Sequence, residues 1–252
     1  MAICIEILGK IRYNGEKEGD KTLKQYEILL LDADETLFDF PRAESEAVCD
    51  ALRGMGVTAD TEMIATYSRI NDGFWKMLER GEIGKEELRV ARFEAFCRHY
   101  GIVLDVARLA LAYTDALATK CYLLPGALEV CRTLAAHTDL YIITNGIASV
   151  QRGRFSRSPL QGLIKDLFIS EEIGAEKPSK VYFDTVAARI PHFEAEKALI
   201  VGDSLTSDIR GGINAGIDTC WFNRKGKVAP DDMPITYTIR TLEELVPLVL
   251  GA

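Results

Sequence analysis

Two aspartates one residue apart, Asp32 and Asp34, come directly after the apolar residues 28–31. An unbroken apolar run is typical of a strand that is buried on both faces, and parallel sheets bind ligands at the carboxyl ends of such strands. Two carboxylates crowded at that edge repel each other unless a cation or a shared proton relieves the repulsion. The pair therefore predicts a cation or proton site. An acidic turn that closes a strand is the alternative for the pair taken alone.

Polar side chains also follow three later apolar runs of the chain. Residues 140–143 precede Thr144, Asn145 and Gly146; residues 167–169 precede Lys177 beyond a loop; residues 198–201 precede Asp203, with Asp208 five residues further on. Because the carboxyl ends of parallel strands share one edge of a sheet, these groups are expected to converge on one pocket with Asp32 and Asp34. Four strand ends with suitable chemistry, in this order, favour a functional site over a set of unrelated turns.

The apolar spacing divides the chain into two kinds of structure. Apolar residues recur every three or four positions between residues 43 and 120, and glycines break this stretch into about four helices. After residue 123, short apolar runs alternate with amphipathic segments, which is typical of strand-helix units. We therefore predict an α/β fold, with a doubly wound parallel-sheet core over residues 26–42 and 121–252 and an inserted helical cap over 43–120. We predict that residues 1–25 form an N-terminal appendage.

The composition excludes several classes of function. The 252 residues are 48% hydrophobic and 27% charged, which is the balance of a globular protein. A net charge of -8, with scattered basic residues, argues against binding to polymeric nucleic acid. No apolar run is long enough to span a membrane and no leader peptide is evident, so we expect a cytoplasmic protein. The six cysteines form no C-x-x-C pair and are expected to be reduced thiols.

The order of these residues resembles the haloacid dehalogenase superfamily. The motifs appear here as Asp32-x-Asp34-x-Thr36-Leu37, Thr144, Lys177-Pro178 and Gly202-Asp203-x4-Asp208. Residues 32–38, 169–174, 211–216 and 219–223 are similar to the branch of pyrimidine 5'-nucleotidases. Glu35 stands where a glycine is commoner in the superfamily, and that difference is typical of this branch.

The resemblance implies a role for each motif residue. Asp32 would attack phosphorus and form an aspartyl-phosphate, and Asp34 would act as general acid and base. Phosphoryl oxygens would be bound by Thr144, Asn145, Gly146 and Lys177. Mg²⁺, or Mn²⁺ in its place, would be held by Asp32, the main-chain carbonyl of Asp34, and Asp203. Thr36 would orient the acid-base residue or make a local turn bond, and Asp208 would orient a water molecule or Lys177.

The cap carries a second set of candidates, which could reach a base or a sugar or could equally belong to the cap's own core: Phe74, Trp75, Arg89, Arg92 and Phe96. The resemblance implies a Mg²⁺-dependent phosphohydrolase, monomeric or homodimeric, without a membrane partner. Its substrate would be a small phosphorylated metabolite, a nucleoside 5'-monophosphate such as dUMP, dTMP or UMP. The alternatives are a phosphosugar or other small-metabolite phosphatase, a haloacid dehalogenase, and a non-catalytic regulator that only binds a phosphorylated ligand.

Overall fold

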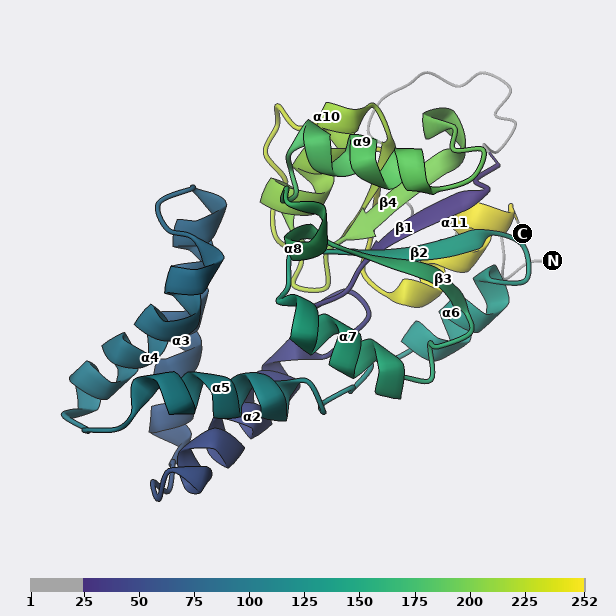
Figure 1. Cartoon of the computed structure of the whole chain (residues 1–252). Helices are drawn as coiled ribbons and strands as arrows, with labels where there is room; N and C mark the ends of the chain where they lie inside the picture. The colour runs from purple at the N-terminus through teal and green to yellow at the C-terminus, as the bar shows by residue number, and fades with distance from the viewer. Residues whose placement is uncertain (1–24, 252) are drawn as a thin grey trace. The chain divides into compact units, whose positions relative to one another are not determined.

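The computed structural model describes residues 25–251, so the predicted appendage lies outside the described residues except for residue 25. The core is a six-stranded parallel sheet with the strand order β3-β2-β1-β4-β5-β6 (Figure 1). Its strands are β1 (Ile28–Asp32), β2 (Asp139–Thr144), β3 (Ile164–Ile169), β4 (Ala198–Gly202), β5 (Asp218–Phe222) and β6 (Tyr237–Ile239). The predicted fold class is confirmed.

Helices cover both faces of this sheet, which explains why its central strands β1 and β4 are apolar up to their last residues. Every residue of β1 and β4 is buried. Helices α9 (Lys180–Arg189) and α10 (Arg210–Ala215) lie on one face, and α6 (Ala127–Leu134) and α11 (Leu245–Leu250) lie on the other (Figure 1). The short helix α8 (Ser170–Ile173) follows β3. In this doubly wound arrangement, the carboxyl ends of β1, β2 and β4 lie at the same edge of the sheet.

Strand register places the predicted site residues at matching depths. Strand β1 pairs with β2 so that Asp32 lies opposite Ile143, and it pairs with β4 so that Leu31 lies opposite Val201. The residues that follow these positions, Thr144 and Gly202, therefore lie at the same edge as Asp32. The three-residue strand β6 was not among the predicted strands, because so short a segment has no period of its own.

A second compact unit comprises Phe40–Tyr122 together with Ser149–Arg157. It contains the four helices that the glycine breaks predict: α2 (Phe40–Gly54), α3 (Thr61–Glu79), α4 (Lys85–Tyr100) and α5 (Val106–Leu117). The side chains of Asp60 and Asp105 cap the amino ends of α3 and α5 by accepting backbone N–H bonds. Gly101 ends α4 in the left-handed conformation.

Helix α7 (Ala148–Arg157) contributes its residues 149–157 to this helical unit, although the sequence pattern places them in the core. The Arg154 Nε donates to the carbonyl oxygen of Lys120 at 3.0 Å, and Gly153 lies against Ala118. The spacing of apolar residues does not reveal such contacts, because they join segments far apart in the sequence.

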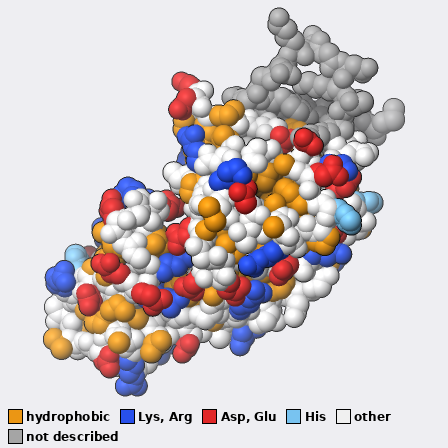
Figure 2. Space-filling view, turned by 45° about the horizontal axis from the view of Figure 1, so that its top comes forward, with side chains coloured by type: hydrophobic (Ala, Val, Ile, Leu, Met, Phe, Trp, Pro, Cys, Tyr) orange, Lys and Arg blue, Asp and Glu red, His pale blue; other side chains and the backbone are white. Residues whose placement is uncertain are grey.

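The surface agrees with the scattered basic residues of the sequence. Lys and Arg alternate with Asp and Glu on the face that Figure 2 shows. Within residues 25–251, no helix combines the length and the apolar character that crossing a membrane requires.

The contact between Gly153 and Ala118 yields a stability prediction for the helical unit. A Cβ at Gly153 would lie 2.8 Å from the Ala118 Cβ and 2.9 Å from its carbonyl oxygen, so we expect Gly153→Ala to destabilise the protein by about 1–3 kcal/mol. Gly73→Ala is the matched control, because nothing lies within 4 Å of its added Cβ and alanine is the better helix former. Urea unfolding followed by circular dichroism measures both. Equal effects of the two substitutions would contradict the packing described.

Candidate active site

The side chain of Lys177 joins three segments at the carboxyl edge of the sheet. Its ammonium donates to the Asp32 Oδ1 at 2.7 Å, to the Asp208 Oδ1 at 2.7 Å and to the carbonyl oxygen of Ile143 at 3.0 Å. The lysine and both carboxylates are buried. Because an ammonium has three N–H donors, these contacts satisfy Lys177 completely.

Asp208 is committed to positioning this lysine. Its Oδ1 accepts from Lys177, and its Oδ2 accepts from the backbone N–H of Ser204 at 3.1 Å. The Asp208 side chain packs so closely on Gly202 that a Cβ there would lie 2.2 Å from the carboxylate oxygen. A glycine at position 202 is therefore required for this approach, which brings Asp208 into contact with Lys177.

Three carboxylates come close enough together to share a cation. Asp32, Asp203 and Asp208 each offer an oxygen, and these atoms lie within 4.8 Å of one another. Both Asp208 oxygens accept hydrogen bonds, whereas among the described residues no donor is recorded for the second oxygen of Asp32 or for the Asp203 side chain. Hard oxygen donors of this kind fit Mg²⁺. The donor set thus matches the predicted ligands Asp32 and Asp203, beside the half-buried Asp34.

The protonation of these groups follows from crowding in a buried place. Burial, the Asp208 carboxylate and Glu35 raise the pKa of Asp203 to about 7, against the opposing effect of the lysines. Burial and Asp208 also raise the pKa of Asp32 well above its ordinary value, although Lys177 lowers it. Burial would lower the pKa of Lys177, but Asp208 and Asp32 reverse this and keep it charged. One ammonium faces three carboxyl groups, so a proton or a divalent cation must balance the negative charge that the ammonium leaves uncompensated.

The loop after β2 is held by backbone and side-chain hydrogen bonds. The Asn145 side chain donates to the Lys177 carbonyl oxygen and accepts from the Lys177 backbone N–H, both at 2.9 Å. The Gly146 N–H donates to the Thr144 hydroxyl at 3.0 Å. Asn145 therefore fixes the backbone of Lys177 and uses one of the two N–H donors of its side-chain amide in doing so.

Tyr182, which the sequence analysis did not single out, supports the same loop from helix α9. Its hydroxyl donates to the Phe168 carbonyl oxygen at 2.8 Å and accepts from the Thr144 N–H at 3.1 Å. In the sequence, Tyr182 reads as an ordinary apolar position of an amphipathic helix, so no local signal identifies it.

Thr36 is buried, and its hydroxyl has no hydrogen-bond partner within the described part of the chain. Its predicted role in orienting Asp34 is therefore not carried by a hydrogen bond in this structure. A local turn bond from this hydroxyl is absent from the described residues as well.

The candidate residues of the helical unit divide by burial. Phe96 and Arg92 belong to the unit's own core, where the Arg92 guanidinium lies 4.8 Å from the centre of the Tyr113 ring and donates to Asn71 at 2.8 Å. Phe74 and Trp75 are half-buried. Arg89 pairs with Glu86 at 3.2 Å.

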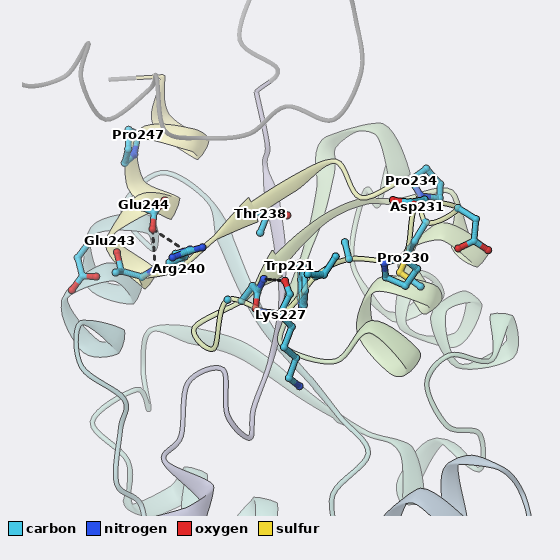
Figure 3. A pocket seen from close by; sticks show the side chains of 17 residues that line it. Trp221, Lys227, Pro230, Asp231, Pro234, Thr238, Arg240, Glu243, Glu244 and Pro247 are labelled. Carbon is cyan, nitrogen blue, oxygen red and sulfur yellow. Dashed lines mark hydrogen bonds between the residues drawn. The ribbon is translucent and has the colours of Figure 1, made fainter.

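A hollow of about 1360 Å³ in the core unit is lined by none of the predicted site residues. It lies along the edge strand β6, with Trp221 and Lys227 at its centre and Arg240, Thr238 and the residues after β5 around it (Figure 3). The indole N–H of Trp221, which lines this hollow, donates to the Asp203 carbonyl oxygen at 3.0 Å.

A family model described as haloacid dehalogenase-like hydrolase matches residues 26–216. The chain therefore belongs to this family of hydrolases, as its motifs predict. The Bacillus subtilis protein YfnB, named as a HAD hydrolase, is 41% identical over 223 residues, which cover 88% of this chain and 95% of YfnB. A crystal structure of YfnB bound to magnesium matches with a TM-score of 0.85 and covers 90% of this chain and 99% of that one.

Two further relatives carry a named activity. Pyrimidine 5'-nucleotidase PynA of Streptococcus pneumoniae is 37% identical, with coverage of 88% of this chain and 94% of PynA. Pyrimidine 5'-nucleotidase YjjG of Escherichia coli is 32% identical, with coverage of 89% of this chain and 98% of YjjG. Family and relatives together are consistent with a phosphoric monoester hydrolase.

The raised pKa of Asp203 predicts how pH affects the metal-free protein. Between about pH 4 and pH 7, folded Asp203 keeps a proton that the unfolded chain has lost, so the folded state binds more protons and its stability falls as pH rises. We expect the difference in melting temperature between wild type and Asp203→Asn to shrink or change sign in favour of Asn across this window. Melting curves in chelator at half-unit pH steps measure it. A difference that does not change with pH would contradict the assignment.

Proposed function

We propose that the protein is a Mg²⁺-dependent phosphohydrolase that removes phosphate from pyrimidine nucleoside 5'-monophosphates through an aspartyl-phosphate at Asp32. The observation that carries the proposal is the buried Lys177 ammonium, which holds Asp32 and Asp208 at 2.7 Å each beside the oxygens of Asp203. The names of PynA and YjjG support the substrate class.

Asp32 is the nucleophile of the proposed reaction. Its Oδ1 accepts from Lys177, which leaves the second oxygen to attack phosphorus and expel the nucleoside oxygen. Asp34 gives a proton to that leaving oxygen. In the second step Asp34 takes a proton from water, which attacks the same phosphorus and releases phosphate and the Asp32 carboxylate.

Lys177 would act mainly through its charge and through the orientation of Asp32. All three of its N–H donors are already used within the protein, so a bond to a phosphoryl oxygen requires the exchange of one existing bond. The Thr144 hydroxyl, at the end of β2, would bind another phosphoryl oxygen.

Asp203, the main-chain carbonyl of Asp34 and the Asp32 oxygen that does not attack phosphorus would hold the metal ion, with Mn²⁺ able to replace Mg²⁺. When bound, the cation supplies the positive charge that two carboxylates and a phosphate dianion need in order to approach one another. Neither Asp34 nor Asp203 is needed by a dehalogenase that attacks carbon, so their presence favours phosphoryl transfer. A cytoplasmic location and a monomeric or dimeric state stay predictions.

We expect Asp32→Asn to lower phosphatase turnover roughly 10³-fold or more, because an amide cannot form the covalent intermediate. Asp184→Asn, a change on the exposed face of α9, is the matched control and should keep full turnover. Steady-state release of inorganic phosphate measures both, with circular dichroism to verify the fold. Turnover of the Asp32 variant within tenfold of wild type would contradict the assignment of Asp32 as the nucleophile.

A substrate panel tests the proposed function itself. With Mg²⁺ present, dUMP, dTMP and UMP should be hydrolysed with a kcat/KM at least about tenfold above that for hexose and pentose phosphates, which corresponds to about 1.4 kcal/mol of transition-state binding. Chelator should abolish activity and added Mg²⁺ should restore it. A panel led by sugar phosphates would favour the phosphosugar alternative, and activity indifferent to chelator would reject the metal.

A further inference from the structure

Glu35 adopts a backbone conformation that is costly for any residue but glycine. Its φ is 62°, in the left-handed region, and the turn is held by hydrogen bonds from the Glu35 N–H to the Phe38 carbonyl and from the Leu37 N–H to the Ala33 carbonyl, both 2.9 Å. The φ angle of Glu35 sets the orientation of the preceding peptide group. That peptide carries the Asp34 carbonyl, so the Glu35 conformation aims it.

The Glu35 carboxylate is paired with a residue that lies far away in the sequence. Its Oε2 lies 3.0 Å from the Nζ of Lys225, in the loop after β5. The Glu35 side chain is 20% exposed and that of Lys225 is 66% exposed. The ion pair thus links the turn after β1 to the loop after β5, and both belong to the same compact unit.

An exposed ion pair between two flexible side chains contributes little, but the backbone beneath Lys225 is braced. The buried side chain of Asn223 donates to the Lys227 carbonyl at 2.8 Å and accepts from the Lys227 N–H at 2.9 Å. The Asn223 N–H also donates to the Ile239 carbonyl at 2.8 Å. Lys225 therefore projects from a loop whose backbone is fixed on both sides.

Glu35 and Lys225 lie beside Asp203, one member of the carboxylate cluster. Together with Asp203 and Trp221 they line one small hollow beside it. Glu35 and Lys225 line the same hollow as Asp203 and carry opposite charges. Each member of the pair therefore acts on the Asp203 carboxylate with its own charge, and in opposite directions.

We propose that Glu35 and Lys225 are a pair of positioning residues that set the affinity of the Asp203 side of the cluster for a divalent cation. The inference rests on the proposed metal-dependent function. Glu35 adds negative charge and aims the Asp34 carbonyl, and Lys225 cancels most of that charge so that a phosphate dianion can still approach.

The two charges predict opposite effects for the two single variants. Glu35→Gln leaves Lys225 unpaired beside Asp203, so Mg²⁺ binding should weaken about three- to tenfold. Lys225→Met leaves the Glu35 carboxylate unpaired, so Mg²⁺ binding should tighten about threefold, and less at high ionic strength. The double variant should return close to wild type. A role in loop structure alone would weaken binding in both single variants.

Mg²⁺ affinity can be measured on the substrate-free full chain. The sequence contains two tryptophans, so Trp75→Phe leaves Trp221, which is hydrogen-bonded to the Asp203 carbonyl, as the fluorescent reporter of a MgCl₂ titration. The Mg²⁺ dependence of the melting temperature is the second readout. Arg132→Met removes one charge of the exposed pair with Glu129 and is the control, expected to leave affinity unchanged.

The outcomes separate this inference from the proposed function. Opposite shifts in the two single variants, restored in the double variant, support the inference. Equal affinities, or weaker binding in both, overturn it while leaving the metal-dependent reaction in place. No saturable Mg²⁺ binding by wild type in either readout would overturn the metal part of the proposed function and this inference with it.

Discussion

The placement of one buried ammonium between two carboxylates is the constraint on which the rest of this site depends. Removing Lys177 from water is costly, and only the contacts with Asp32, Asp208 and the Ile143 carbonyl offset that cost. Each partner comes from a different segment: the end of β1, the end of β2 and the short helical segment Leu205–Ile209 after β4. The ammonium is satisfied only when these strands pair in the observed register, so the chemistry and the topology of the sheet specify each other.

Supporting residues convert this charge cluster into a fixed geometry. Asn145 holds the backbone of Lys177 through two hydrogen bonds, and Tyr182 holds the Thr144 backbone against β3. Gly202 lets Asp208 approach β4 closely enough to accept from Lys177. The direction of the Lys177 and Asp32 side chains depends on these three residues. Positioning of this kind decides whether charges in a buried site act on the intended atom.

The sequence predicts the parts of the molecule that leave a local signal. Buried strands read as apolar runs, and the acids, Thr144 and Lys177 stand directly after them, so their convergence follows from parallel-strand geometry. Strand β6 is too short to show a period. The packing of residues 149–157 on the helical unit, the hydroxyl of Tyr182 and the contact between Gly202 and Asp208 all depend on segments far apart in the chain. These features become visible only when the distances are known.

The charges of the site explain why it contains two kinds of lysine. Lys177 is buried, fully bonded and kept charged by its carboxylates, so it is a permanent part of the structure. Lys225 stands at the rim, two-thirds exposed, and forms an ion pair with Glu35. A buried ammonium alone leaves three carboxylates undercompensated, which favours a divalent cation but would repel a phosphate dianion. A second, screened positive charge at the rim offsets that repulsion. It does not compete with the cation for the buried carboxylates, because its field weakens with ionic strength and with distance.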